Sequence, residues 1–268
     1  MTLTQIAAYL DDLCHQAGKI MLGARNDAES SVSSKSGSSN FVTKYDVAIQ
    51  EHLISRIKAR IPDAVFLVEE QENDASVLMG EHCFIIDPID GTSNFIHDYS
   101  NCCVSIAMVS RGEAVLGAIY DPYRNELYMA QKGKGATLNG KPIRVSDRPV
   151  ELAVSAFGTS PYYKDTLADD TFALAKEVFL VMADVRRCGS AALDFAHVAA
   201  GRIESFFECI LSPWDFAAGA LIVAEAGGIV TQFDGSSVDF SAPCSILAGT
   251  RNTHPTLLAL AEKVKNQK

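Results

Sequence analysis

The sequence lacks an apolar run long enough to cross a bilayer, which takes about 20 consecutive apolar residues. Its first residues, 1–13, contain no basic segment and carry Asp11 and Asp12, so we expect no signal peptide. Both absences predict a protein of the cytoplasm that does not bind membranes.

An excess of positive charge is also missing. The formal net charge of −10 argues against a nucleic-acid partner, although bound cations could still let the protein accept a small phosphorylated substrate. The seven cysteines include no C-x-x-C, and neither they nor the six histidines have zinc-ligand spacing. We therefore expect reduced, mostly buried thiols, as in a cytoplasmic protein.

The first half of the chain is predicted to mix helices with an antiparallel sheet. Amphipathic patterns predict helices over residues 4–22 and from Asp46 to Ile57. The serine-rich residues 29–39, which include Lys35, are predicted to form a loop. Three apolar segments joined by short turns predict a meander of strands over residues 102–109, 113–120 and 126–130.

The composition changes near Pro149, and strand-like and helix-like segments alternate from there on. This alternation indicates an α/β second half. We therefore divide the chain into residues 1–149 and 150–268, and expect the two parts to form one compact catalytic unit. Within the second part, residues 186–190 form a glycine-containing turn into a helix, a candidate polar wall of a pocket.

Residues 84–95 are the most informative stretch. An apolar run at 84–86 predicts a buried strand, which we expect Asp87 and Pro88 to end. Asp90 follows three residues after Asp87, so a turn can bring both carboxylates to one point. Taken alone, this pattern is more often an acidic turn whose carboxylates bond only to their own backbone.

The residues that follow favour an anion. Gly91 can adopt backbone angles that other residues resist, and Thr92 or Ser93 suits a helix N-cap. The free N–H groups at such a helix start form a phosphate-sized nest.

Acidic residues stand at five predicted element boundaries: Asp46, Glu69, Asp87, Asp90 and Asp215. Each has a simpler explanation as a helix cap, a turn residue or an exposed acid. Together they offer only oxygen ligands, which favour a hard divalent ion, Mg²⁺ first and Mn²⁺ or Ca²⁺ less. Two or three such ions would remove the repulsion between the carboxylates and would support an in-line displacement at phosphorus.

The motifs resemble those of the inositol monophosphatase family over nearly the whole chain. The most specific is D-P-I-D-G-T-S-N-F at residues 87–95, preceded by Glu69-Glu70 and followed by W-D-F-A-A-G at 214–219. Further matches are V-T-x-x-D at 42–46, G-K-G-A at 133–136 and E-A-G-G at 225–228.

The resemblance implies an α/β (α+β) fold, a layered αβαβα sandwich with an antiparallel N-terminal sheet and a smaller mixed C-terminal sheet, usually as a homodimer. It implies that Glu69, Asp87 and the carbonyl of Ile89 hold a first Mg²⁺, and that Asp87, Asp90 and Asp215 hold a second. A third, weaker ion would lie by Glu69 and the Asp46 region. The first half would thus carry most of the metal ligands.

By the same resemblance, Asp46 and Thr92 orient and deprotonate the attacking water, with Glu69 and Asp90 also catalytic. The substrate would contact these residues: Gly91, Thr92, Ser190, Ala191, Glu208 and Asp215. Lys35 matches a lysine on a mobile loop near the metals. Inhibition by Li⁺ is implied as well.

These implications predict a Mg²⁺-dependent phosphomonoesterase acting on myo-inositol monophosphate. The same chemistry could serve fructose-1,6-bisphosphate, histidinol phosphate, NADP or adenosine 3′,5′-bisphosphate. A non-catalytic metabolite-binding protein on the same scaffold is another alternative, although it would need neither Thr92 nor Asp46. A structural Ca²⁺ domain is disfavoured because the acids are dispersed along the chain instead of gathered in one loop.

Overall fold

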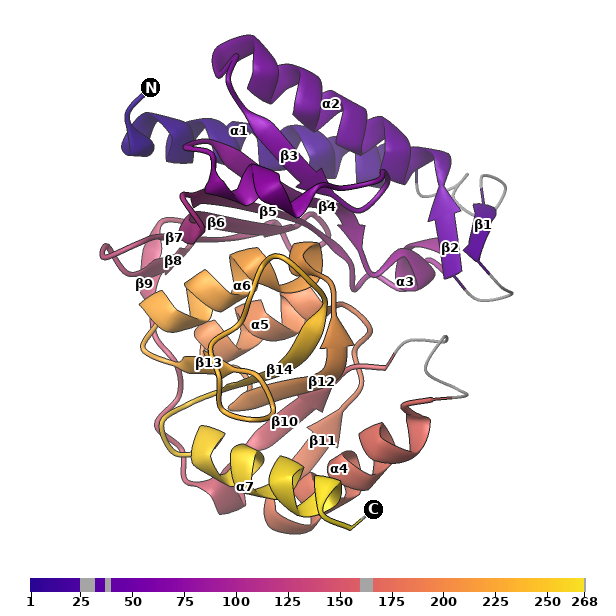
Figure 1. Ribbon diagram of the computed structural model, residues 1–268, viewed down its shortest axis with the longest axis vertical. Coiled ribbons are helices and arrows are strands. Elements are labelled where there is room, and N and C mark those ends of the chain that lie inside the picture. Colours follow the sequence, from indigo (N-terminus) through magenta and orange to yellow (C-terminus); the bar gives the residue numbers. More distant parts are fainter. Residues whose placement is uncertain (25–31, 37–39, 160–165, 268) are drawn as a thin grey trace.

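The computed structural model describes residues 1–24, 32–36, 40–159 and 166–267 of the chain. Its elements form five layers, two sheets alternating with three layers of helices (Figure 1). The predicted αβαβα sandwich is therefore confirmed. In the described part of the chain, no helix combines the length and the apolar character needed to cross a membrane.

The first helical layer consists of α1 (Leu3–Gly23) and α2 (Lys44–Arg60), which cover the outer face of the first sheet (Figure 1). Apolar side chains from one stripe of each helix, such as Leu10, Leu13 and Leu53, are fully buried against Ile86 and Ile106 of that sheet. This periodic burial is why the sequence pattern predicted both helices.

The first sheet has seven strands in chain order: β3 (Val65–Val68), β4 (Cys83–Asp90), β5 (Cys103–Ser110), β6 (Glu113–Asp121), β7 (Glu126–Gln131), β8 (Ala136–Leu138) and β9 (Lys141–Ile143). All neighbours are antiparallel except β3 and β4. The N-terminal sheet, predicted to be antiparallel, therefore contains one parallel pair. Residues 69–82, which include the 3₁₀ helix η2 (Ala75–Met79), carry the chain back so that β4 can run parallel to β3.

Two local predictions also need correction. Residues 32–36 of the predicted serine-rich loop form a strand, β1 (Val32–Ser36), paired antiparallel with β2 (Asn40–Thr43). Residues 29–31 and 37–39 lie outside the described part. Pro88 does not end its strand, because β4 continues to Asp90 through a break in register between Asp87 and Asp90. A bulge of this kind tolerates proline because the ladder hydrogen bond is already missing there.

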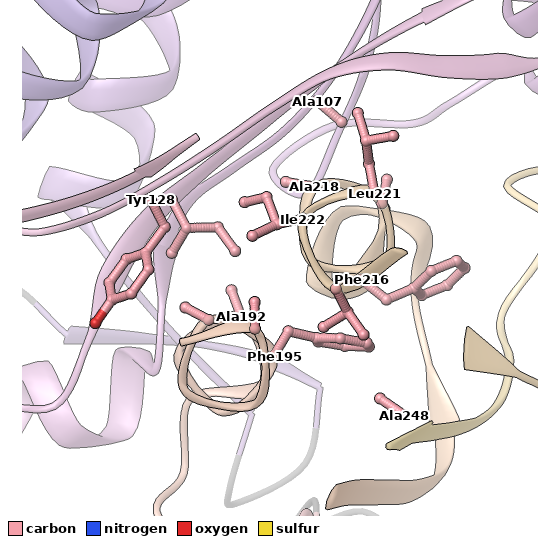
Figure 2. Packing of buried hydrophobic residues seen from close by; sticks show 14 of the residues in the cluster. Ala107, Tyr128, Ala192, Phe195, Phe216, Ala218, Leu221, Ile222 and Ala248 are labelled. Atoms are coloured by element: carbon pink, nitrogen blue, oxygen red, sulfur yellow. The ribbon is translucent and has the colours of Figure 1, made fainter. Parts of the chain in front are cut away.

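The middle layer consists of α5 (Ala191–Ala199) and α6 (Pro213–Glu225), packed between the two sheets. Figure 2 shows Phe195 of α5 and Phe216 of α6 in this core, with Tyr128 from the first sheet on one side and Ala248 from the second on the other. Gly219 allows the two helices to approach closely, since a Cβ there would lie 2.5 Å from the Cβ of Phe195.

The second sheet is mixed, as predicted. Its strands stand in the order β11 (Asp184–Arg186), β10 (Val154–Phe157), β12 (Ser205–Leu211), β14 (Cys244–Gly249) and β13 (Ile229–Thr231). Strand β10 is parallel to both of its neighbours, whereas β14 is antiparallel to both of its own. Helices α4 (Ala168–Val181) and α7 (His254–Lys265) cover its outer face (Figure 1). The short helices α3 (Thr92–Ile96) and η3 (Val150–Leu152) complete the elements used below.

Candidate active site

The site begins where β3 and β4 end side by side. Val68 pairs with Ile86 in the parallel ladder, and the N–H of Glu69 donates to the carbonyl of Ile86 at 3.3 Å. Because parallel strands present their carboxyl ends at the same edge, Glu69 leaves β3 beside Asp87 of β4. The pairing of two segments that the sequence separates thus brings the first two acids together.

The break in register at the end of β4 determines how the Asp87 and Asp90 carboxylates are placed. The N–H of Ile89 donates to Asp87 Oδ1 at 2.9 Å, which holds the Asp87 carboxylate against its own turn. Asp90 re-enters the ladder opposite Cys103. The acidic-turn interpretation thus describes the local bonding of Asp87 but not that of Asp90, and both carboxylates are buried.

Asp215 completes the acidic cluster from the other half of the chain. It lies in the first turn of α6, where its Oδ2 accepts a hydrogen bond from the N–H of Ser212 at 2.8 Å. Asp87, Asp90 and Asp215 each offer one carboxylate oxygen, and these oxygens lie within 4.8 Å of one another. Asp215 therefore caps α6 and also belongs to the acidic cluster.

The electrostatics of this cluster favour a cation. Burial raises the pKa of Asp87 well above its usual range, and the charges of Glu69, Asp90, Asp215 and Asp46 raise it further. Burial, followed by the charges of Glu69 and Asp90, likewise raises the pKa of Asp215. Burial raises the pKa of Asp90 to about 6, despite hydrogen bonds that lower it. A bound divalent cation would stabilise all three carboxylates in their charged form, so this oxygen-only donor set fits a hard metal ion.

One oxygen of Asp90 is held by the start of α5. Asp90 Oδ2 accepts hydrogen bonds from the hydroxyl of Ser190 and from the N–H of Ala192, the latter at 2.8 Å. Ser190 is also the N-cap of α5 and is almost fully buried. The predicted substrate contact Ser190 therefore holds Asp90 in place within the protein itself.

A second polar group lies beside the cluster, where α2 and α3 begin. Asp46 is fully buried, and its Oδ2 accepts from the N–H and the hydroxyl of Thr43 at 2.8 and 2.6 Å. Its Oδ1 lies 3.2 Å from Thr92 Oγ1, which also lies 3.1 Å from the carbonyl oxygen of Ile89. The predicted water-handling residues Thr92 and Asp46 are thus in hydrogen-bond contact with each other.

The predicted start of the next helix needs a small correction. Gly91, with a φ of 94°, is the N-cap of α3, and Thr92 is its first residue. We expected Thr92 or Ser93 to be the cap. Only glycine adopts this left-handed conformation freely, and the tight exit from β4 requires it.

A cavity of about 140 Å³ adjoins the cluster, and five predicted site residues line it: Asp90, Ser190, Ala191, Glu208 and Asp215. Gly158 also lines it. A Cβ at this position would lie 1.8 Å from Glu208 Oε2, so the Glu208 carboxylate leaves no space for a side chain here. The sequence interpretation missed Gly158 as a contact of Glu208, since nothing local to either residue signals the pairing. It did mark the turn at 186–190, and Arg187 and Gly189 of that turn line the cavity.

Two further residues belong to the described wall. Thr159 accepts hydrogen bonds from Arg187, whose Nε lies 3.2 Å from the Thr159 hydroxyl and whose Nη2 lies 2.8 Å from its carbonyl oxygen. Asp194 lies in the first turn of α5, where the sequence pattern indicates only a helix. The side chain of Lys35, predicted to lie near the metals, is outside the described part of the structure.

Comparison with known proteins agrees with this geometry. The family model described as "Inositol monophosphatase family" matches residues 2–266. Nus factor SuhB of Salmonella typhimurium strain 14028s is 38% identical over 252 residues, which is 91% of each chain. An IMPase from Thermotoga maritima is 31% identical with a TM-score of 0.88, covering 97% of this chain and 98% of that one.

A structure of SaIMPase-II with inositol monophosphate bound is also similar. It is 27% identical with a TM-score of 0.82, and the match covers 98% of this chain and 96% of that one. The motifs, the layered fold and the acidic cluster agree with these matches over nearly the full length. The chain therefore belongs to the inositol monophosphatase family.

Proposed function

We propose that this chain is a Mg²⁺-dependent phosphomonoesterase that hydrolyses myo-inositol monophosphate to inositol and phosphate. The observation that carries the proposal is the cluster of Asp87, Asp90 and Asp215, whose oxygens lie within 4.8 Å of one another beside a cavity that two of them line. Membership of the family and the relative with bound inositol monophosphate support the choice of substrate.

The proposed metal ligands are Glu69, Asp87, Asp90 and Asp215 together with the carbonyl of Ile89. They would hold two or three Mg²⁺ ions, for which Mn²⁺ is a substitute. When bound, such ions lower the pKa of a water ligand and cancel negative charge on the phosphoryl and leaving oxygens. The raised pKa values of the three aspartates support this assignment, because only a cation makes their joint ionisation favourable.

We assign Thr92 and Asp46 to the attacking water. The Thr92 hydroxyl carries one proton and has two acceptors in reach, Asp46 Oδ1 and the carbonyl of Ile89. Its lone pairs can therefore accept a proton from water while Asp46 draws the hydroxyl proton. The water oxygen then bonds to phosphorus as the ester P–O bond breaks, and the departing alkoxide takes up a proton from solvent. The N–H groups of Gly91 and Thr92 are assigned to the phosphate oxygens.

The alcohol half of the ester is assigned to the cavity wall formed by Ser190, Ala191 and Glu208. Glu208 offers carboxylate oxygens to vicinal hydroxyls, which suits a polyol. The cavity volume of about 140 Å³ is below the ~300 Å³ at which sites for drug-sized ligands begin. A small polyol or sugar phosphate is thus favoured over NADP or adenosine 3′,5′-bisphosphate.

A second candidate function is a non-catalytic role, suggested by the relatives named Nus factor SuhB, which are 38% identical over 91% of this chain. On that view the scaffold would act without hydrolysis. The contact between Thr92 and Asp46, beside a complete acidic cluster, favours the catalytic function, because a scaffold would require neither.

We also propose that the chain forms a homodimer. Three large apolar side chains of α4 are strongly exposed: Phe172 (59%), Phe179 (54%) and Leu180 (65%). Burying them against a second copy would remove apolar surface from water. The division into residues 1–149 and 150–268 and the cytoplasmic location remain predictions.

Measuring phosphate release tests the proposed function. The panel contains myo-inositol 1-phosphate, fructose-1,6-bisphosphate, histidinol phosphate, NADP and adenosine 3′,5′-bisphosphate, each with Mg²⁺ and with a chelator. We expect fastest release from the inositol ester, only with Mg²⁺, and inhibition by Li⁺. Preference for another ester would change the substrate, and release that persists after chelation would refute the metal-dependent chemistry.

A further inference from the structure

One carboxyl in the cavity wall has an oxygen without a partner. Among the described residues, Asp194 Oδ1 is the buried side-chain oxygen or nitrogen that no hydrogen bond satisfies. Asp194 lies in α5, is 1% exposed and lines the same cavity as Asp90, Glu208 and Asp215. Buried polar atoms are almost always hydrogen-bonded, so this oxygen requires an explanation.

The protein groups around Asp194 do not supply the missing bond. The Cys188 thiol lies close enough to the Asp194 carboxyl to lower its pKa, but Oδ1 stays unpaired. The nearby cation, Arg187, directs its Nε and Nη2 to Thr159, which also lines the cavity. Asp194 also lines the cavity, so a group bound there is a candidate partner for Oδ1.

The position of the cavity indicates what would fill it. Asp90 and Asp215 belong to the acidic cluster, where the phosphoryl group is assigned, and they also line the cavity. The alcohol half of a bound ester must then extend between Glu208 and α5. Glu208 lies directly against Gly158 in this wall, since its carboxylate occupies the space that any side chain at position 158 would need.

We propose that Asp194 is a substrate-binding residue that determines specificity by hydrogen-bonding a hydroxyl of the alcohol half of the ester through Oδ1. This inference rests on the proposed function. A hydroxyl suits the position because it can both donate and accept, and so can pair with a carboxylate or with a carboxylic acid. Burial raises the pKa of Asp194 well above its usual range, so both forms are relevant.

A binding experiment that needs no turnover tests this role. Calorimetry with Ca²⁺ in place of Mg²⁺ compares myo-inositol 1-phosphate with inorganic phosphate, for the unmodified chain and for Asp194→Ala. We expect affinity for the inositol ester to fall about tenfold, as for loss of one hydrogen bond to a polar group, and affinity for phosphate to stay unchanged. Equal losses for both probes, no loss for either, or a parent chain that does not bind the inositol ester would overturn the inference.

Two further variants separate binding from folding. Asp194→Asn keeps the shape and one acceptor oxygen, so it should retain more affinity for the inositol ester than Asp194→Ala. Asp121→Ala is a matched control, because Asp121 is fully buried but bonds to the N–H of Tyr123 and to Arg124 instead of lining the cavity. It should lower Tm without changing the ratio of the two affinities.

Turnover supplies an independent readout with Mg²⁺. For Asp194→Ala, kcat/KM should fall about tenfold on myo-inositol 1-phosphate, through KM, and stay constant on p-nitrophenyl phosphate, which has no hydroxyl to bind. A parallel fall on both esters would make Asp194 merely structural. If the unmodified chain hydrolyses neither ester, the proposed function fails, while the calorimetry still decides the role of Asp194.

Discussion

Asp90 joins more parts of the site than any other single residue described above. One of its oxygens is fixed by Ser190 and Ala192 of α5, and the carboxylate also belongs to the acidic cluster. We predict that Asp90→Asn lowers kcat by about a hundredfold or more, because a neutral amide is a weak metal ligand. The fold should persist, as judged by circular dichroism and Tm.

Asp234→Asn provides the control for this change, because Asp234 lies on an exposed turn, where it bonds to Ser236. It should leave kcat unaltered. An Asp90→Asn protein with normal kcat would remove Asp90 from the site.

The contact between Thr92 and Asp46 leads to a second prediction. Thr92→Ala should lower kcat about a hundredfold, the lower end for a group that transfers a proton, whereas Thr92→Ser should keep most of the activity. Mg²⁺ affinity, measured by calorimetry, should change little in either variant. If serine and alanine at position 92 gave the same loss, the hydroxyl would have no role in the reaction.

At the scale of elements, α6 is held tightly against the first sheet. A Cβ on Gly117 of β6 would lie 2.8 Å from the carbonyl oxygen of Ala218 in α6, a backbone atom that cannot move alone. Gly117→Ala should therefore lower the free energy of unfolding by about 1–3 kcal/mol. It should also weaken Mg²⁺ binding, because α6 carries Asp215.

Gly23 offers the matched control, since nothing lies within 4 Å of a Cβ built there. Gly23→Ala, at the end of α1, should raise stability by about 0.4–1 kcal/mol through the unfolded chain. Chemical denaturation measures both changes. A Gly117→Ala protein as stable as the parent would mean that α6 and β6 are not in tight contact.

The elements also show which features local sequence can predict. The buried stripes of α1 and α2 and the meander of β5, β6 and β7 follow from periodicity, so their patterns were sufficient. The parallel pairing of β3 with β4 and the pairing of β1 with β2 depend on partners chosen over longer range, which periodicity does not specify. Pro88 was misleading because a bulge accommodates it, and only the pairing with β5 reveals that bulge.

The site itself was predictable in a different way. Asp87 and Asp90 stand at a strand end, which local reasoning can detect, but Asp215 is more than a hundred positions away and equally explained as a helix residue. The family motifs supplied the link that local patterns lack. Asp194 escaped both routes, because its importance comes from the cavity and not from any motif.

At the scale of the whole molecule, hydrogen bonds connect residues 1–149 with residues 150–268, some of them near the site. The side chains of Asn94 and Asn101 both donate to the carbonyl of Cys188, at 2.9 and 3.2 Å. Further from the site, Glu225 accepts from the N–H groups of Gly133 and Gly135 at 2.7 Å each. These contacts join residues before position 149 to residues after it, so the acidic cluster depends on how the parts dock.

The stability of the whole protein should depend on pH, in one direction without metal and in the other through bound Mg²⁺. Without metal, burial raises the pKa of Asp90 from 3.8 to about 6. The folded state then binds more protons than the unfolded state in this range, so the metal-free protein should lose stability as pH rises from about 4 to about 6. Mg²⁺ needs the charged form, so its stabilising effect should grow over the same range.

Thermal unfolding with Mg²⁺ and with a chelator, at pH 5 and pH 8, measures this dependence. The increase in Tm caused by Mg²⁺ should be larger at pH 8. An increase that is equal at both values, or larger at pH 5, would show that the binding groups do not titrate as buried carboxyls.

The most direct test of the account locates the metal itself. Crystals grown with Mn²⁺, which prefers the same oxygen ligands as Mg²⁺, allow the ion to be located from its anomalous scattering. We predict at least one strong anomalous peak bonded to carboxylate oxygens of Asp87, Asp90 and Asp215, with no such peak in the Asp90→Asn protein if the cluster acts as a unit. An ordered site without any peak at saturating Mn²⁺ would contradict the central claim that these carboxylates form a divalent-cation site.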